Sequence, residues 1–172
     1  QQLAELDVAD FQLLAHQIKK ALQKKSNELE NIGREAVQII QNQGLINQDF
    51  YQGDKGLGAF FSKLYHNPGA HLGPVKISSY LLKTVEENKW ASGKASSSTL
   101  AAIDRVKDDL SELFNQYRDY QTQEAPRYFL LQTIQKELHR LALIHQVKQA
   151  FDEVLQDNQQ VFIADFNRRI LD

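Results

Sequence analysis

Apolar residues recur at intervals of three and four positions over three long stretches of the chain. This is the period with which one face of a helix repeats. The stretches cover residues 8–42, 98–122 and 126–158. Ser98 or Thr99 can cap the second, and Pro126 suits the first turn of the third, where its missing N–H has no partner anyway. We therefore predict three long helices.

The region between the first two helices has a different pattern. Six of the eight glycines fall between residues 44 and 74, among several aromatic residues. Short helices are predicted at 57–66 and 78–88, and the small polar residues of 89–98 predict a mobile loop. Gly33, inside the first helix, predicts a bend or a close contact with another helix. The predicted fold class is all-α: an irregular helical bundle with three long helices and a smaller glycine-rich helical cap.

The same periodicity predicts which side chains form the core. Six residues are expected to be buried: Phe11, Ile18, Leu110, Phe114, Leu138 and Leu141. The last long helix is expected to turn one apolar side inward, made of Phe129, Leu130, Ile134, Leu138, Leu141, Ile144, Val147, Phe151, Val154 and Leu155.

Composition narrows the class of protein. With 172 residues, 42% of them apolar and 24% charged, the chain fits one globular domain, and we predict a single helical domain over 1–172. No apolar stretch approaches the roughly 18 residues that a membrane helix needs. There is no cysteine, which fits a reducing compartment, so we expect a cytoplasmic protein without a membrane partner. Both ends resemble cut points, which suggests a piece of a longer protein.

No catalytic constellation is visible. The segment Gly53–Gly58 lacks the Lys-Ser/Thr pair of a phosphate-binding loop, and a turn leading into a helix is the favoured interpretation. His139 and His145 are six residues apart and fall on opposite helix faces, while His66 and His71 lack a nearby carboxylate. We therefore predict no catalytic residue and no metal site.

Charge is distributed unevenly along the chain. Residues 55–107 contain eight basic and three acidic side chains, a balance of +5, although the whole chain has a formal charge of −2. A basic stretch with aromatic residues is typical of a surface that contacts nucleic-acid phosphates, whereas scattered lysines on a solvated surface would look the same in sequence. The candidate DNA-binding residues are Lys63, Lys76, Lys83, Lys89, Trp90 and Lys94.

Three segments resemble one protein family. Residues 161–171 contain Asp165-Phe166 and the apolar Ile170, and are similar to the segment that returns from accessory domain 1B to the motor domain in DNA helicases of the UvrD/RecB type. Residues 128–158 resemble the long helix before it, and residues 55–64 resemble part of the 1B domain of RecB-like helicase/nuclease subunits. Asn167 and Arg168 depart from the family's two aspartates.

The resemblance implies a non-catalytic accessory domain of an ATP-dependent DNA helicase involved in DNA repair. It implies that ATP and Mg²⁺ bind to the parent protein and not to this chain, and that residues 159–172 return towards the motor domain. The implied partners are DNA, contacted through its backbone without sequence specificity, and the motor domains of the same polypeptide. A helical protein-interaction or scaffolding domain is the alternative, because long amphipathic helices suffice for it.

Overall fold

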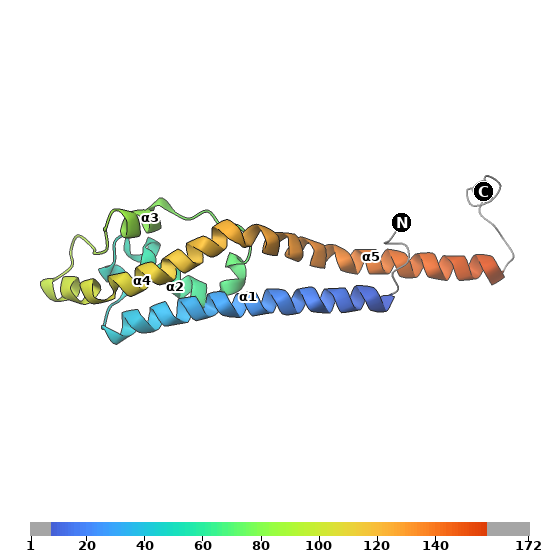
Figure 1. The fold of residues 1–172 in the computed structure, drawn as a ribbon, viewed down its shortest axis with the longest axis horizontal. Coiled ribbons are helices and arrows are strands. Elements are labelled where there is room, and N and C mark those ends of the chain that lie inside the picture. Colours follow the sequence, from blue (N-terminus) through green and yellow to red (C-terminus); the bar gives the residue numbers. More distant parts are fainter. Residues whose placement is uncertain (1–7, 158–172) are drawn as a thin grey trace. The chain divides into compact units, whose positions relative to one another are not determined.

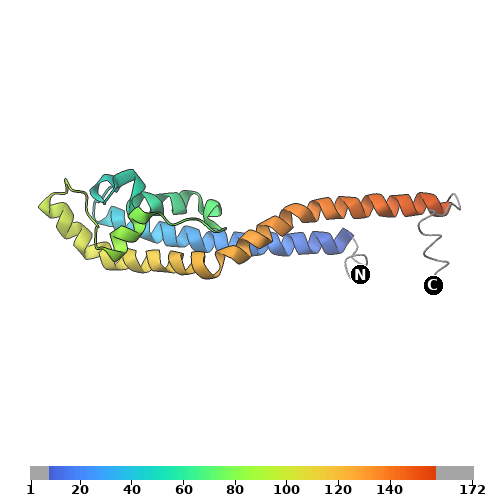
Figure 2. The same ribbon diagram turned by 90° about the horizontal axis from the view of Figure 1, so that it is seen from above.

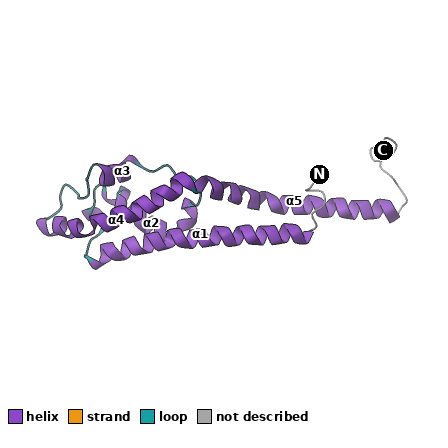
Figure 3. Ribbon diagram, in the orientation of Figure 1, coloured by secondary structure: helices purple, strands orange, loops and turns teal. Residues whose placement is uncertain are grey.

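The computed structural model describes residues 8–157 of the chain. Its elements are, in order, α1 (Val8–Asn42), the 3₁₀ turns η2 (Asn47–Asp49) and η3 (Gly53–Lys55), α2 (Leu57–His66), the 3₁₀ turn η4 (Pro68–His71), α3 (Ser79–Glu86), α4 (Ser97–Gln123) and α5 (Ala125–Asp157) (Figure 1). Within residues 8–157 there is no β-strand (Figure 3). The predicted all-α class is confirmed, with α1, α4 and α5 as its three long helices.

Serine side chains begin two of the helices. Ser78 Oγ accepts a hydrogen bond from the Leu81 backbone N–H at 3.4 Å and caps α3 as expected. Helix α4 begins earlier than predicted, because Ser96 has the extended backbone of a cap and its Oγ accepts from the Thr99 N–H at 3.2 Å. The hydroxyl of Ser98 lies 2.8 Å from Ser96 Oγ, inside the helix, so the predicted cap at Ser98 or Thr99 is wrong.

The chain divides into two compact units, with α1 and α5 each contributing to both. Unit 1 consists of residues up to Lys19 together with residues from Thr133 onward, and unit 2 is Lys20–Gln132. In unit 2 the second half of α1 and helix α4 run antiparallel, and the short elements of residues 44–96 cover them (Figure 2). The fully buried large side chains of this unit are Leu29, Phe50, Leu57, Phe61, Leu64, Leu110, Phe114 and Tyr117.

The backbones of α1 and α2 approach each other closely at Gly33. A Cβ atom added at Gly33 would lie 2.5 Å from the backbone nitrogen and 2.8 Å from the Cα of Tyr65. Neither atom belongs to a flexible side chain, so only glycine fits there without a shift of the backbone. The close helix contact predicted at Gly33 is confirmed.

The segment expected to be a mobile loop is tied to the rest of unit 2 at its beginning. The Tyr51 N–H donates to the Trp90 carbonyl at 2.8 Å, and the Ser92 N–H donates to the Asp49 carbonyl at 2.8 Å. These two bonds flank an antiparallel bridge between Phe50 and Ala91. The sequence pattern missed this pairing because its partner segment is about forty residues away along the chain.

Unit 1 is packed more sparsely. Phe11, Ile18 and Leu138 are buried as predicted, and the rings of Phe11 and His145 lie 5.9 Å apart. Leu141 was also expected in the core but is 44% exposed. Most of the predicted inward side of α5 is exposed as well, namely Phe129, Leu130, Ile134, Ile144, Val147, Phe151 and Val154.

The error on α5 has a simple physical cause. Its apolar residues spread over more than one face of the helix, whereas a helix at the surface of a domain buries only one stripe. The face with Leu138 is buried, and that leaves Leu141 and Ile144 towards solvent. The predictions for residues 159–172, including the segment that carries the family resemblance, lie outside the described residues.

Candidate functional site

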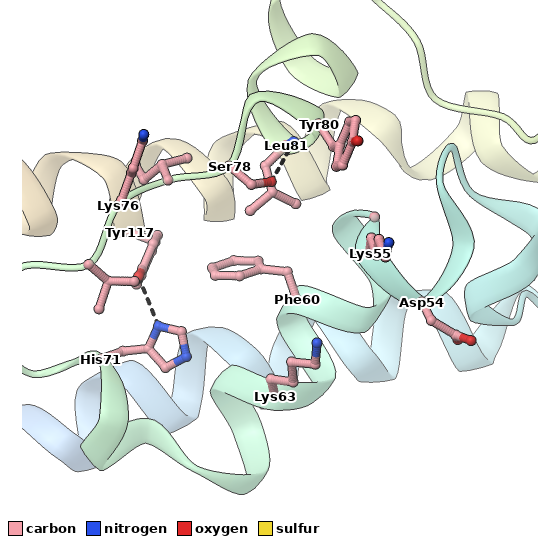
Figure 4. Close-up of a pocket in the computed structure, with 13 residues that line it drawn as sticks. Asp54, Lys55, Phe60, Lys63, His71, Lys76, Ser78, Tyr80, Leu81 and Tyr117 are labelled. Atoms are coloured by element: carbon pink, nitrogen blue, oxygen red, sulfur yellow. Dashed lines mark hydrogen bonds between the residues drawn. The ribbon is translucent and has the colours of Figure 1, made fainter.

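Unit 2 contains a pocket of about 320 Å³ between α2, α4 and the chain that leads into α3 (Figure 4). This volume lies at the lower end of the range of small-ligand sites. Its lining residues come from four separate segments of the chain: Asp54, Lys55, Gly56, Phe60, Lys63, His71, Val75, Lys76, Ile77, Ser78, Tyr80, Leu81 and Tyr117.

The floor of the pocket is aromatic. Helix α2 buries Phe61 and Leu64 on one side, which leaves Phe60 on the side of the pocket. Figure 4 shows the Phe60 ring between the turn at Ser78 and the pair formed by His71 and Tyr117. Its ring centroid lies 4.8 Å from that of Tyr117 and 5.9 Å from that of His71, in edge-to-face geometry. Such contacts fix the ring, so the floor is preorganised rather than mobile.

A neutral polar pair closes one end of the floor. His71 Nδ1 lies 2.9 Å from the hydroxyl oxygen of Tyr117, within hydrogen-bond distance. Burial lowers the pKa of His71, because it disfavours the imidazolium ion, and it raises the pKa of Tyr117 because it disfavours the phenolate. Both groups are therefore uncharged near neutral pH, and this end of the pocket carries no charge of its own.

Helix α4 holds the chain that forms the pocket wall. The Gln121 side chain donates to the His71 carbonyl at 2.9 Å and accepts from the Val75 N–H at 2.8 Å, and the Tyr120 hydroxyl donates to the Leu72 carbonyl. Residues 117, 120 and 121 share one helix face because they are three and four positions apart. Tyr120 and Gln121 satisfy backbone groups of residues 71–75, and Tyr117 contacts the His71 side chain, so this face of α4 fixes the path of residues 71–75.

Lysines form the rim of the pocket. Lys55, Lys63 and Lys76 line it from three different segments, and all three are exposed. Asp54 is the one carboxylate among the lining residues, and in Figure 4 it points away from the Phe60 ring. Its Oδ1 accepts a hydrogen bond from Gln48 at 3.2 Å. The pocket therefore has an aromatic floor below a positively charged rim.

The structure brings together two of the six candidate residues, Lys63 and Lys76. Lys83 is half-buried in the last turn of α3 and does not line the pocket. Lys94 lies at a separate hollow formed by residues 48–53 and 92–95. Lys89 lies 2.6 Å from a carboxylate oxygen of Glu87, and this hydrogen bond raises the pKa of Lys89 and lowers that of Glu87. The five lysines therefore do not line a single pocket.

Trp90 has a different role from the one expected of it. Its side chain is 6% exposed and belongs to the core of unit 2, so the indole offers no face to an unpaired base in this structure. The sequence suggested exposure because small polar residues follow Trp90. In the structure the Trp90 carbonyl accepts a hydrogen bond from the Tyr51 N–H, which holds this segment against residues 49–51.

Lys55 and Tyr80 line the pocket but were not among the six candidates. Lys55 was counted in the basic stretch but follows a glycine-rich turn, where a binding role is hard to distinguish from a solvated turn. Tyr80 is 38% exposed at the pocket, although the helical pattern of residues 78–88 would also allow it to face inward, and its ring lies 6.5 Å from that of Tyr51. The sequence signal for this part of the pocket was the group of aromatic side chains between residues 50 and 65. It did not show which segments of the chain pack together.

The weaker chemical candidates have structural roles. Gly53 adopts φ +47° in the turn η3, and Gly56 leads directly into α2, as expected for a turn that precedes a helix. The ring of His66 contacts Tyr65, with centroids 4.7 Å apart, while His71 contacts Tyr117. Within the part of the chain that the structure describes, no three histidine or acidic side chains are grouped as metal ligands.

Comparisons of the chain with protein-family models, with curated proteins and with solved structures give no significant match. Across residues 8–157, no helix has the length and apolar character required to cross a membrane.

Proposed function

We propose that the chain is a non-catalytic helical accessory domain that binds single-stranded nucleic acid at the lysine-rimmed pocket of unit 2. The observation that carries the proposal is that Lys55, Lys63 and Lys76 all line one aromatic-floored pocket. Proteins that bind single strands without sequence preference combine a cationic groove for phosphates with aromatic rings for bases. The helicase resemblance supports the same role, as a surface of a larger ATP-dependent DNA helicase that guides DNA at the fork.

The division of labour within the pocket follows from the side chains. The three ammonium groups attract phosphates, and Phe60 and Tyr80 offer ring faces and edges to a base. Because phosphate attraction and ring stacking carry no sequence information, the binding is expected to be independent of sequence.

The experiment is a salt titration of binding to a fluorescently labelled oligonucleotide, followed by anisotropy. The variant Lys63→Ala/Lys76→Ala should bind more weakly, and its slope of log affinity against log salt should fall by up to about 1.4, at about 0.7 per lost phosphate contact with a single strand. Tyr80→Ala should weaken binding by about 1–3 kcal/mol without changing the slope. The buried Trp90 provides a fluorescence check that each variant is folded.

A matched control uses two exposed lysines of the same unit, Lys20→Ala/Lys24→Ala, which lie on α1 away from the pocket residues. This control should keep most of the affinity. The variant Lys89→Ala/Lys94→Ala tests the wider surface. If it alone lowers the affinity and slope, the contact surface lies elsewhere; if the pocket variant and the α1 control behave alike, the pocket has no specific role.

A second function is favoured by a different observation. Exposed apolar side chains along α5, among them Leu141, Leu143, Ile144 and Val147, are typical of an interaction surface rather than of an isolated domain. A helical protein-interaction domain therefore remains the alternative, and both functions are compatible because they use different parts of the chain.

A further inference from the structure

One face of α5 in unit 1 carries an apolar stripe that is interrupted by two charges. Its members follow one another at spacings of three and four: Ile134, Glu137, Leu141, Ile144, Lys148 and Phe151. All six are exposed, with values of 44% for Leu141 and 64% for Ile144. A stripe with this spacing is the seam by which two helices pack against each other.

The stripe is distinct from the face of α5 that packs within unit 1. That packed face carries the buried Leu138 and the half-buried His145, whose ring centroid lies 5.9 Å from that of Phe11. On a helix with 3.6 residues per turn, Leu138 and His145 lie about 100° around the axis from Glu137 and Ile144 and about 40° from Ile134 and Leu141, so the packed face borders the stripe on one side, while all six stripe residues stay exposed. Helix α5 can therefore keep its contact with α1 and still offer the stripe to another helix.

The order of residues along the stripe is complementary to its own reverse. When two copies of the stripe are aligned antiparallel with Leu141 opposite Ile144, Glu137 of each copy faces Lys148 of the other. In the same register Ile134 faces Phe151. At every position, therefore, an apolar residue faces an apolar residue or a charge faces the opposite charge.

We infer that the occupant of this face is a second copy of the chain, paired antiparallel through residues 134–151 of α5. Placement of the two charges at equal distances from the centre of the stripe, between residues 142 and 143, is what a self-complementary pairing requires. A parallel pair in register would set Glu137 against Glu137 and Lys148 against Lys148, and like charges at such positions oppose association.

The local salt bridge of Glu137 is compatible with this pairing. Arg140 Nη1 lies 3.0 Å from a carboxylate oxygen of Glu137 within one chain, and Arg140 is among the most exposed side chains of the helix. In the pair, the Glu137 carboxylate has room for two cationic partners because its oxygens accept several hydrogen bonds. Arg140 then lies at the edge of the seam, beside the contact between Glu137 and Lys148.

Sedimentation equilibrium of the full chain tests the inference through a charge exchange. Glu137→Lys alone and Lys148→Glu alone should each weaken the dimer by at least about tenfold, because each variant sets like charges against each other in both layers. An equimolar mixture of the two variants should recover association, since the mixed pair again matches opposite charges. The double variant Glu137→Lys/Lys148→Glu should also associate.

Control variants carry the same charge changes at exposed positions outside the stripe, Lys136→Glu and Glu153→Lys, and they should associate like the unchanged chain. The inference is overturned if the unchanged chain stays monomeric at concentrations up to about 1 mM. It is also overturned if it associates but the single exchanges have no effect, which would indicate a different surface, or if mixing them gives no recovery. If the chain never dimerises but a different protein binds it at Ile144, the stripe is a docking site for that protein and not for a second copy.

Discussion

Helices α4 and α5 are both long and rich in apolar residues but differ in how many of these residues they bury. In α4 the residues Ile103, Val106, Leu110, Leu113, Phe114, Tyr117 and Tyr120 are all buried, whereas in α5 most large apolar side chains beyond Leu138 are exposed. The difference teaches that a helical period shows which residues can share a face. The number of elements that pack around the helix decides which faces are covered.

The glycine-rich segment accounts for the better packing of α4. Residues 44–96 contain α2, α3 and three short 3₁₀ turns, and they reach α4 through hydrogen bonds such as that from Gln121 to the His71 carbonyl. Unit 1 contains only α1 and α5 among its described elements, so each helix there can bury a single stripe.

Truncation of one large apolar residue in each helix should give the largest contrast. Phe114→Ala should lower the free energy of unfolding of unit 2 by about 3–5 kcal/mol, because it leaves a cavity in a fully buried site. Ile144→Ala should change the stability by no more than about 0.5 kcal/mol, since this side chain is exposed. Urea unfolding measures both free energies, at a protein concentration too low for self-association. Similar losses for the two variants would contradict the packing described.

Leu138→Ala tests whether unit 1 has a core of its own. It should cost roughly 2–5 kcal/mol, as a truncation of a buried leucine. Faster amide hydrogen exchange in residues 8–19 and in the part of α5 around residue 138 should accompany the loss. Leu141→Ala is the matched control, expected to be nearly neutral; a larger cost for Leu141→Ala than for Leu138→Ala would reverse the assignment of faces.

Gly33→Ala separates helix propensity from packing. Propensity alone predicts that alanine stabilises α1 by up to about 1 kcal/mol. The short distance from the added Cβ to the Tyr65 backbone predicts the opposite, a loss of about 1–3 kcal/mol from overpacking. Thermal unfolding followed by circular dichroism decides the sign, with Gly93→Ala as the control, because no atom lies within 4 Å of a Cβ added at Gly93.

The smallest expected effect is a dependence of the stability of unit 2 on pH. Burial lowers the pKa of His71 below its ordinary value of 6.5, so the unfolded chain binds the proton more readily than the folded one. The contribution to stability is therefore present above pH 6.5 and is lost as the pH falls through the lowered pKa. Unfolding free energies from pH 8 to 5 should decline less in His71→Gln than in the unchanged chain.

His66→Gln is the control for this measurement, because His66 is exposed and lies near His71 in sequence. It should leave the decline between pH 8 and 5 in place. If the decline disappears in His66→Gln and persists in His71→Gln, the proton that lowers the stability binds to His66 and not to His71.

Much of the fold was open to prediction because its signals are local. The spacing of apolar residues and the prolines and serines at helix ends depend on neighbours within a few positions, and α2 has the predicted bounds, Leu57–His66. The candidate site was less predictable. The +5 stretch contained Lys55, Lys63 and Lys76 but gave no reason to prefer them to Lys89, whose partner Glu87 lies only two residues away. Charge counts along a chain do not specify which side chains converge.

The sequence by itself determined that this chain forms helices and where they begin and end within a few residues, and it showed no apolar stretch of the length that a membrane helix needs. Only the tertiary structure decided that Trp90 is buried, that Leu141 is exposed and that three lysines share a pocket with Phe60. The physical reason is the distance along the chain over which each kind of interaction acts. Helix formation follows from hydrogen bonds four residues apart, whereas burial and convergence depend on contacts between segments that lie tens of residues apart along the chain.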